Sequence, residues 1–477
     1  MKEAGRRRDA GSTTARAHPA VAAFAADRTG SLRRRAAVLA AGLLVALVAP
    51  APAQRVLSLE DALHTALARN PSIESASAAA AAAASARWAD WGAFLPTATT
   101  SISFTSNKFT NVTFLSPEGV SQRLDEPIKS TSKSASQALT LGLSLFELEN
   151  VANLKSGAAS EEAAFLRLTE AERRVIRDVK QAYFEALKQQ RLVEVAERQL
   201  ESRRQDQEIT ARRYRIAAAS RSDLLGAQID ASDAELRLFD ARDARAAALR
   251  SLQVLLGIDP TEEPASPVLR DVEELPDAGS LDAELLVGRA MRSNPGLRAR
   301  ESDRAAASAS VWAARASFLP RFTASLSFSR SEQLGPGDAL FNFSPDNTNR
   351  NLSITGSWSL FNGFARKRQT AEASQRLRQS EADLTDTRHR LEKDVRDLVA
   401  EIRRRSRRLE LIERNLELAR ERLDLARQQY RLGSIPYFNL QQAIDRLTLA
   451  EQQLFQERYD YLIRWAELEE RLGGEVR

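Results

Sequence analysis

The chain lacks cysteine altogether and has only three histidines and two methionines among its 477 residues. The absence of cysteine excludes disulfides, thiolate metal sites and a lipid-modified N-terminal cysteine. His18, His64 and His389 lie far apart in the sequence, and no His/Asp/Glu cluster, nucleophile elbow or Walker motif accompanies them. The sequence therefore predicts no metal site, no cofactor and no enzymatic activity.

A large excess of one charge sign is also missing once the N-terminus is set aside. The whole chain carries 69 basic and 64 acidic residues, for a net charge of +5. Residues 1–53 hold nine basic and three acidic residues, which leaves 60 basic against 61 acidic residues in the remainder. A chain so close to neutral gives no electrostatic argument for a nucleic-acid partner.

Long hydrophobic runs are scarce, and the most extended one lies near the N-terminus. Arg33-Arg34-Arg35 precedes an apolar stretch, Ala36–Val48, which is followed by Ala51-Pro52-Ala53. Basic, apolar and small-residue segments in this order are typical of a signal peptide, and the apolar stretch is too short for a permanent membrane anchor. We expect residues 1–53 to be a signal peptide with an N-terminal extension, and no transmembrane helix after it.

The remainder is an internal repeat. We predict a first repeat over residues 55–257, a stiff acidic linker over 258–279 and a second repeat over 280–473. The landmarks recur in one order: Asn70-Pro71 with Asn294-Pro295, Trp88 with Trp312, Phe94-Leu95-Pro96 with Phe318-Leu319-Pro320, Leu145-Phe146 with Leu360-Phe361, Tyr214 with Tyr430, and Leu256-Gly257 with Leu472-Gly473.

Each repeat contains a pair of segments in which apolar and small polar residues alternate, at about 97–147 and about 321–361. Leu139, Leu141, Leu143 and Leu145 alternate with Thr140, Gly142 and Ser144, for example. Strands of about ten residues with this alternation are typical of membrane β-barrels. A soluble sandwich also alternates, but its exposed face normally carries Lys and Glu, whereas these polar faces are almost wholly Ser and Thr. The polar stretches 107–137 and 330–350 are expected to be loops.

A long helical hairpin follows each strand pair, at about 150–257 and about 363–473. Apolar residues at heptad spacing, such as Leu391, Ile402, Leu409 and Leu416, predict helices far longer than those of globular proteins. The expected fold class is mixed and mainly α. Internally duplicated α-helical hairpins form a periplasmic coiled-coil barrel, and four transmembrane β-strands per chain complete a 12-stranded β-barrel in a trimer, because lipid does not tolerate open sheet edges.

These landmarks resemble the outer membrane efflux protein (TolC-like) family over essentially all of residues 55–477. The resemblance implies a homotrimeric, outer-membrane channel-tunnel with a long periplasmic extension in a Gram-negative cell envelope, in contact with outer-membrane lipid. It would be the passive exit duct of a tripartite efflux or type I secretion system. An inner-membrane pump of the RND, ABC or MFS type would deliver substrates through a periplasmic adaptor (membrane fusion protein).

The same resemblance implies which residues carry the function, at the tips of the two hairpins. Adaptor docking is expected at Tyr214, Arg215, Ala217, Ser220, Tyr430, Arg431, Leu432, Gly433 and Ser434. The periplasmic entrance constriction is expected at Asp223, Asn439 and Gln442, with Asp223 alternatively serving only the helix N-terminus. An exported structural or adhesive coiled-coil surface protein is the other function that the sequence leaves open, although it does not account for the duplicated strand pairs.

Overall fold

The computed structural model describes residues 56–115, 119, 121–259, 267–272, 274–335, 338, 346 and 348–475. The chain divides into two units, Met1–Arg55 and Val56–Arg477, and all described residues belong to the second unit. The expected signal peptide and its cleavage site lie outside the described residues. No helix in the described part of the chain is long and apolar enough to cross a membrane.

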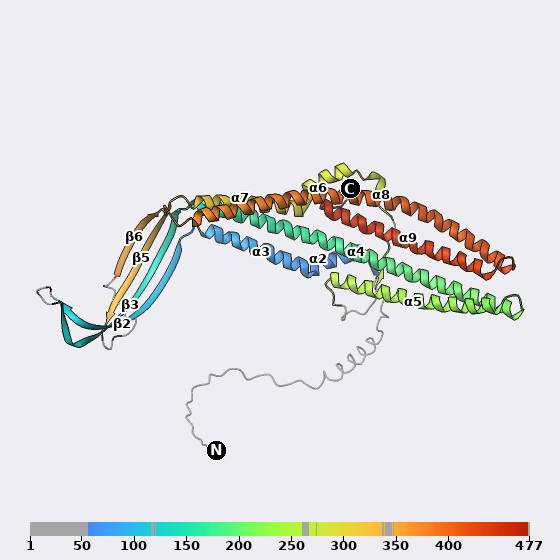
Figure 1. Cartoon of the computed structure of the whole chain (residues 1–477), viewed down its shortest axis with the longest axis horizontal. Helices are drawn as coiled ribbons and strands as arrows, with labels where there is room; N and C mark the ends of the chain where they lie inside the picture. Colours follow the sequence, from blue (N-terminus) through green and yellow to red (C-terminus); the bar gives the residue numbers. More distant parts are fainter. Residues whose placement is uncertain are drawn as a thin grey trace, which may run out of the picture. The chain divides into compact units, whose positions relative to one another are not determined.

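Both repeats begin with two helices, continue with a strand pair and end with a long helical hairpin (Figure 1). The first repeat comprises α2 (Leu59–Arg69), α3 (Pro71–Gly92), β2 (Thr97–Leu115), β3 (Ser121–Phe146), α4 (Leu148–Arg215) and α5 (Arg221–Leu255). The second comprises α6 (Ala283–Ser293), α7 (Pro295–Ala316), β5 (Arg321–Leu334), β6 (Thr348–Ser357), α8 (Ala365–Arg431) and α9 (Tyr437–Leu472).

The Asn-Pro landmarks explain how the short helices join. Asn70 ends α2 and its side-chain oxygen accepts the N–H of Ser72, while Pro71 occupies the first turn of α3. Asn294 does the same between α6 and α7, accepting the N–H of Leu297. A capping asparagine followed by proline both stops one helix and starts the next, because proline is tolerated only in a first turn.

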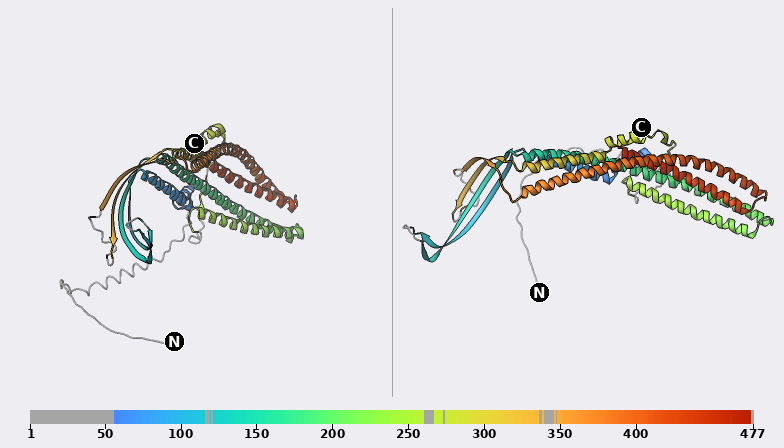
Figure 2. Two further views of the ribbon diagram at one scale, coloured as in Figure 1. Left: turned by 60° about the vertical axis from the view of Figure 1, so that its left-hand side comes forward. Right: turned by 45° about the horizontal axis from the view of Figure 1, so that its top comes forward.

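The four long strands form one antiparallel sheet in the order β2-β3-β5-β6. The loop predictions over 107–137 and 330–350 are wrong in large part, because β2 continues to Leu115, β3 begins at Ser121 and β5 continues to Leu334. The strand pairing of Asn107 with Ser132 and of Thr110 with Lys129 extends the first hairpin well beyond the second. Figure 2 shows this longer β2–β3 arm.

The hairpin helices form a layer in which α5 packs on α4, α4 on α9 and α9 on α8 (Figure 1). Their apolar residues meet at heptad spacing: Leu391, Val395, Ile402, Leu409 and Leu416 of α8 are all buried. Closer to the sheet, the corresponding order is α3, α4, α7 and α8. The core therefore runs as a seam between helices, as a coiled coil requires.

Part of the expected linker is fixed to the helices. Strand β1 (Val56–Leu57) pairs in parallel with β4 (Val268–Leu269), and a short 3-10 helix, η1, follows at Ala278–Ser280. Asp271 holds Arg191 of α4 through a 2.6 Å ion pair and accepts the hydroxyl of Tyr459 of α9 at 3.1 Å. These contacts tie the connection between the repeats to the central pair of helices.

Candidate functional site: the two hairpin tips

The α4–α5 and α8–α9 turns have the same backbone geometry. Each helix ends one or two residues before a residue with positive φ, Ala217 at 55° and Gly433 at 78°. The N–H groups of Ala217 and Ala218 donate to carbonyls of the last turn of α4, and those of Gly433 and Ser434 do the same for α8. This pattern satisfies carbonyls left free at a helix C-terminus.

The side chains that start the return helices differ. Ser220 and Asp223 form a capping box, in which the Ser220 side chain accepts the N–H of Asp223 and the Asp223 carboxylate accepts the N–H of Ser220 at 3.1 Å. Helix α9 follows Pro436 and has no side-chain cap. Asp223 thus has a structural role at its helix N-terminus, and its carboxylate remains partly exposed.

Aromatic side chains of the second tip connect the two turns. Tyr430 is only 4% exposed, and its ring lies 5.9 Å from that of Tyr437 and 4.4 Å from the guanidinium of Arg213 in the first hairpin. Arg213 also donates to the backbone carbonyls of Tyr430 and Ala218. The Tyr430 hydroxyl lies 3.1 Å from the Thr210 hydroxyl of α4. The tips are therefore joined by a buried aromatic and cationic contact.

A polar network centred on the buried side chain of Arg203 extends along the hairpins from Tyr437, the first residue of α9. Arg203 of α4, with a side chain 5% exposed, contacts Asp230 of α5 at 3.4 Å and Asp445 of α9 at 2.5 Å. Asp230 also accepts the Tyr437 hydroxyl at 2.9 Å and the Gln441 amide at 3.0 Å. Burial, together with the Asp230 charge, raises the pKa of Tyr437. We call Arg203, Asp230, Tyr437, Gln441 and Asp445 the latch, because they link both hairpins.

Asp206 lies one turn beyond Arg203 on α4 and is 3% exposed. Burial raises its pKa, while the charges of Arg427, Arg203 and Arg431 act in the opposite direction. Its Oδ2 atom has no hydrogen-bond partner within the described part of the structure. A buried carboxylate with an unpaired oxygen lowers the stability of the packed helices around it.

The structure distributes the residues expected at the tips between the surface and the interior. Leu432 is 83% exposed, and Tyr214, Arg215, Ala217, Ser220, Arg431, Gly433, Ser434, Asn439 and Gln442 are also exposed. Tyr430 is the exception, because it is buried in the contact between the tips. The pocket between the turns brings Ala217, Ser220 and Asp223 together with Tyr430, Gly433 and Ser434.

Sequence reasoning missed the latch, although a signal for it is present. Leu200, Arg203 and Thr210 continue the buried seam of α4 at spacings of three and seven, so Arg203 occupies a position where an apolar residue is expected. The same reasoning applies to Tyr430, which follows Leu409, Leu416 and Leu423 at steps of seven on α8. A charged or hydroxyl-bearing residue within a heptad seam marks such a network.

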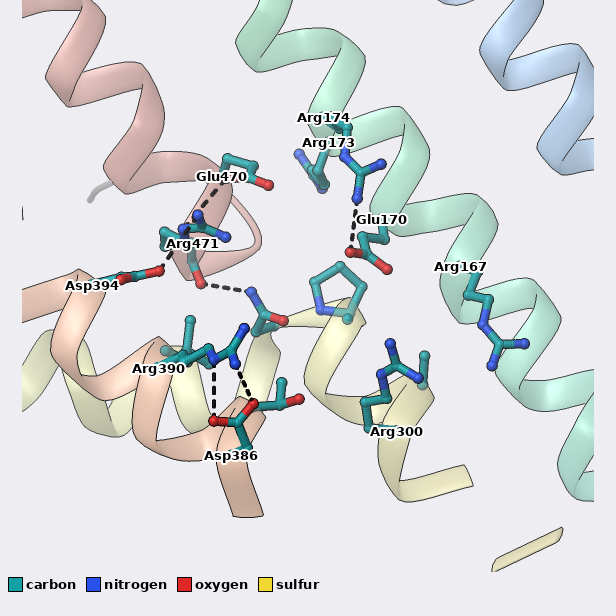
Figure 3. A pocket seen from close by; sticks show the side chains of 16 residues that line it. Arg167, Glu170, Arg173, Arg174, Arg300, Asp386, Arg390, Asp394, Glu470 and Arg471 are labelled. Carbon is teal, nitrogen blue, oxygen red and sulfur yellow. Dashed lines mark hydrogen bonds and ion pairs between the residues drawn. The ribbon is translucent and has the colours of Figure 1, made fainter. Parts of the chain in front are cut away.

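A second pocket, of about 560 Å³, lies where α7 begins against α4, α8 and α9 (Figure 3). Arginines dominate its lining, but carboxylates pair with most of them: Arg174 with Glu170, Arg390 with Asp386, and Arg471 with Asp394. No group of three or more His, Asp or Glu side chains among the described residues is arranged to hold a metal. Two ion pairs of this pocket connect helices: Arg471 of α9 contacts Asp394 of α8, and Arg167 of α4 contacts Asp303 of α7.

This arrangement of a strand sheet and long helical hairpins defines a TolC-like outer-membrane channel. The outer membrane protein VceC of Vibrio cholerae has the same fold, with a TM-score of 0.74, 19% identity, and coverage of 88% of this chain and 97% of VceC. The chain belongs to the outer membrane efflux protein family. The sequence model of this family matches residues 62–258 and 286–474.

Two characterised relatives extend over most of the chain. The alkaline protease secretion protein AprF of Pseudomonas aeruginosa is 25% identical over 86% of this chain and 83% of AprF. The protein CyaE of Bordetella pertussis is 28% identical over 71% of this chain and 68% of CyaE. Family and fold are those of channel proteins rather than enzymes, and they place the sheet in the outer membrane and the hairpins in the periplasm. The alternative of an adhesive coiled coil is thereby excluded.

Proposed function

We propose that three copies of this chain form a continuous passive duct from the periplasm through the outer membrane. The observation that carries this proposal is that every layer is open at the same two edges. The sheet ends in β2 and β6, the helices near the sheet end in α3 and α8, and the hairpin layer ends in α5 and α8. One rotation that joins β6 to β2 of the next copy also joins α8 to α3 and α5, so that a ring closes all layers at once.

The edge helices carry apolar side chains that the single chain leaves uncovered. Leu411, Leu418 and Leu425 of α8, and Leu432 directly after it, recur every seven residues and are all exposed. Leu225, Ile229, Leu236 and Phe239 form an exposed row on α5. Heptad rows of this kind are the seams of coiled coils, and three copies would bury them against one another while giving the sheet twelve strands.

The duct would be closed at its periplasmic end by the latch. Arg203 holds the first hairpin against the second through Asp445, and Asp230 does so through Tyr437 and Gln441, so separation of the hairpins requires these bonds to break. We propose that the exposed residues of the tips dock a periplasmic adaptor, and that the adaptor supplies the free energy that opens the latch. A ring of three Asp223 carboxylates would then face cations at the entrance.

An inner-membrane pump would deliver the cargo, because family and fold are those of a channel. The relationship to AprF, named as a protease secretion protein, favours type I secretion of a protein cargo, within a family described by efflux. Partner pumps of the RND, ABC or MFS type remain compatible with this role.

The absence of native cysteine makes the assembly directly testable. Cysteines would be introduced in pairs, one among Leu411, Leu418 and Leu425 and one among Leu225, Ile229 and Leu236, and the purified protein oxidised. We expect one or more cysteine pairs to give disulfide-linked dimers and trimers and nothing larger. Each single substitution should give at most a dimer. Failure of all nine pairs, or a ladder continuing past three, would contradict the ring.

The conduit itself is tested by single-channel recording in planar bilayers. The wild-type trimer should give a small, cation-preferring current, and Asp223→Asn should reduce the preference for cations. Ser220→Ala is the matched control, because it removes the other half of the capping box while keeping the carboxylate. Equal loss of preference in both variants would assign the effect to the helix cap rather than to the charge.

A further inference from the structure

The two faces of the sheet differ in character, and the strand register identifies which is which. On one face, Leu139 lies between Thr100 and Phe328, and Leu141 lies between Ala98 and Leu326. The opposite face carries hydroxyl and glycine residues, such as Thr140 beside Thr99 and Ser327. In a membrane barrel the apolar face meets lipid, so the Leu139 face is the outer wall and the hydroxyl face lines the lumen.

The height of the apolar wall sets the level of the membrane surface. On β3 the wall extends from Leu145 to the rung at which Ala135 pairs with Phe104, interrupted by Gln137. The ten residue-to-residue steps from Ala135 to Leu145 span about 33 Å along the strand, or about 25 Å along the barrel axis at a tilt of about 40°. That height equals the apolar band of an outer-membrane barrel. On the neighbouring strands charged side chains begin lower, with Glu332 on the Ala135 rung, Arg330 beside Gln137 and Arg350 on the rung of Leu139 and Phe328. On β2 and β3, where the wall ends at Ala135, the headgroup level is placed at the next rung.

That next rung begins a set of three lysines on the same face. Lys133 pairs with Ser106, Lys108 with Thr131, and Lys129 with Thr110, so the three lysines alternate between β3 and β2 on successive rungs. Diagonal neighbours in such a ladder lie about 7–8 Å apart. No acidic residue occupies these three rungs of β2 and β3, and all three lysines are exposed. No ion pair to any described residue involves them.

The same face remains basic across the neighbouring strands. Arg330 and Arg350 lie on it, with Arg330 donating to Thr348 and Arg350 lying over the ring of Phe328. Glu332, which is paired in register with Ala135, is the acidic member of this set and has a partner of its own. The corresponding lumen-facing positions, including Ser134, Gln333, Ser329 and Asn349, are neutral. At these rungs the positive charge therefore lies on the outer wall, whereas Arg321, at the other end of β5, lies on the hydroxyl face beside Ser357.

Three like charges at this spacing repel one another, and this repulsion is relieved when an anion binds between them. Their position directly after the lipid-facing band determines which anion is available there. We propose that Lys108, Lys129 and Lys133 bind the phosphate groups of phosphorylated glycolipid in the outer leaflet. The bound lipid fixes the depth of the barrel and supports the base of the β2–β3 arm, which continues beyond β5. The proposal rests on the outer-membrane placement of the sheet and is independent of what the duct transports.

The test measures lipid binding to the purified full-length protein by native mass spectrometry in detergent. Lipid A with both phosphates would be compared with the same lipid after enzymatic removal of the phosphates. We expect the phosphorylated form to bind at least about tenfold more tightly, and the preference to fall at high salt. Substituting all three lysines with Gln should weaken its binding by about 10- to 100-fold, because each lysine near a charged headgroup contributes about fivefold.

A matched control removes the same charge elsewhere. Lys155→Gln, Lys367→Gln and Lys393→Gln lie on the helices and should leave lipid A binding unchanged. A Lys→Arg variant at the three barrel positions should retain binding, which separates charge from folding. Channel conductance should be equal in the wild-type protein and the Gln variant, because the lysines face away from the lumen.

Three results would overturn the proposal. The first is equal binding of the phosphorylated and dephosphorylated lipids, and the second is equal weakening by the two triple Gln substitutions. The third is complete displacement of lipid A by millimolar inorganic phosphate, which would assign the lysines to a free anion rather than to a lipid headgroup. If the wild-type protein conducted no current, that result would count against the proposed duct. It would not affect the comparison of lipid A binding.

Discussion

The two hairpin tips have one backbone and two different sets of side chains. Both turn through a residue with positive φ placed three positions after a tyrosine, yet Tyr214 is 41% exposed and its counterpart Tyr430 is 4% exposed. The first tip is held by its own capping box, whereas the second is held by aromatic contacts that reach into the first hairpin. The two repeats thus share the same turn. The side chains of the first tip cap a helix, whereas those of the second tip join the two hairpins.

The largest effect should come from removing the two equivalent tyrosines. Tyr430→Ala should destabilise the tips by about 3 kcal/mol, because it empties a buried aromatic site. Tyr214→Ala should change stability by no more than about 0.5 kcal/mol. Hydrogen exchange of the amides between residues 423 and 445 would measure this, with about 100-fold faster exchange expected for Tyr430→Ala alone. Equal effects of the two substitutions would show that the tips do not differ as described.

Weakening the latch should separate the two hairpins without unfolding either. Asp230→Asn removes the charge that accepts from Arg203, Tyr437 and Gln441, at a cost of about 2 kcal/mol. We expect larger or more frequent open currents in single-channel recordings. Asp240→Asn is the matched control, since Asp240 is exposed on the same helix and should leave the current unchanged. If neither Asp230→Asn nor Asp240→Asn changed the current, the latch would have no role in gating.

Asp206 should make the tips sensitive to pH. Because burial raises its pKa above the unfolded value, its contribution to stability is greatest below the unfolded pKa and is lost as pH rises through the folded pKa. Asp206→Asn should therefore stabilise the protein by about 1 kcal/mol at pH 7 and by progressively less toward pH 4. Thermal unfolding of both proteins across this range measures the difference. A difference that stays constant with pH would exclude titration of Asp206 as its cause.

The smallest effects should come from exchanging the two residues at positive φ. A Cβ on Gly433 would meet Arg213 Nη2 at 3.7 Å, which is ordinary contact, so the cost of Gly433→Ala is backbone strain of about 1 kcal/mol. Ala217→Gly should relieve the same strain in the first tip, less the added freedom of the unfolded chain. Thermal unfolding should show opposite signs, and a shared sign would mean that the two turns are not equivalent.

The helical part of the fold could be predicted from the sequence, because a heptad seam records which face of a helix is buried. The hairpins expected at about 150–257 and about 363–473 correspond to α4 with α5, from Leu148 to Leu255, and to α8 with α9, from Ala365 to Leu472. The strand ends were harder to place. Alternation stops being visible once both faces are polar, as in residues 129–134, although main-chain pairing continues there. Two-residue strands such as β1 and β4 carry no periodic signal at all.

The tips were located correctly as turns, but the environment of their side chains was not predictable from the local sequence. Whether Tyr430 faces solvent depends on Arg213 and Thr210, more than two hundred positions away. Arg203 and Asp445 likewise become a pair only when the two hairpins lie together. The assignment of the exposed tip residues to adaptor docking, and of Asp223, Asn439 and Gln442 to the constriction, remains a prediction.

The open edges described above also affect how the molecule is made. A newly exported single copy would present unpaired β2 and β6 main-chain groups and two uncovered leucine-rich rows, which favour aggregation in the aqueous periplasm. In the proposed ring of three copies, folding of this chain would be completed only by association, as in obligate oligomers. Its apparent thermal stability should depend on protein concentration, and its biogenesis requires that newly exported copies be protected until they meet.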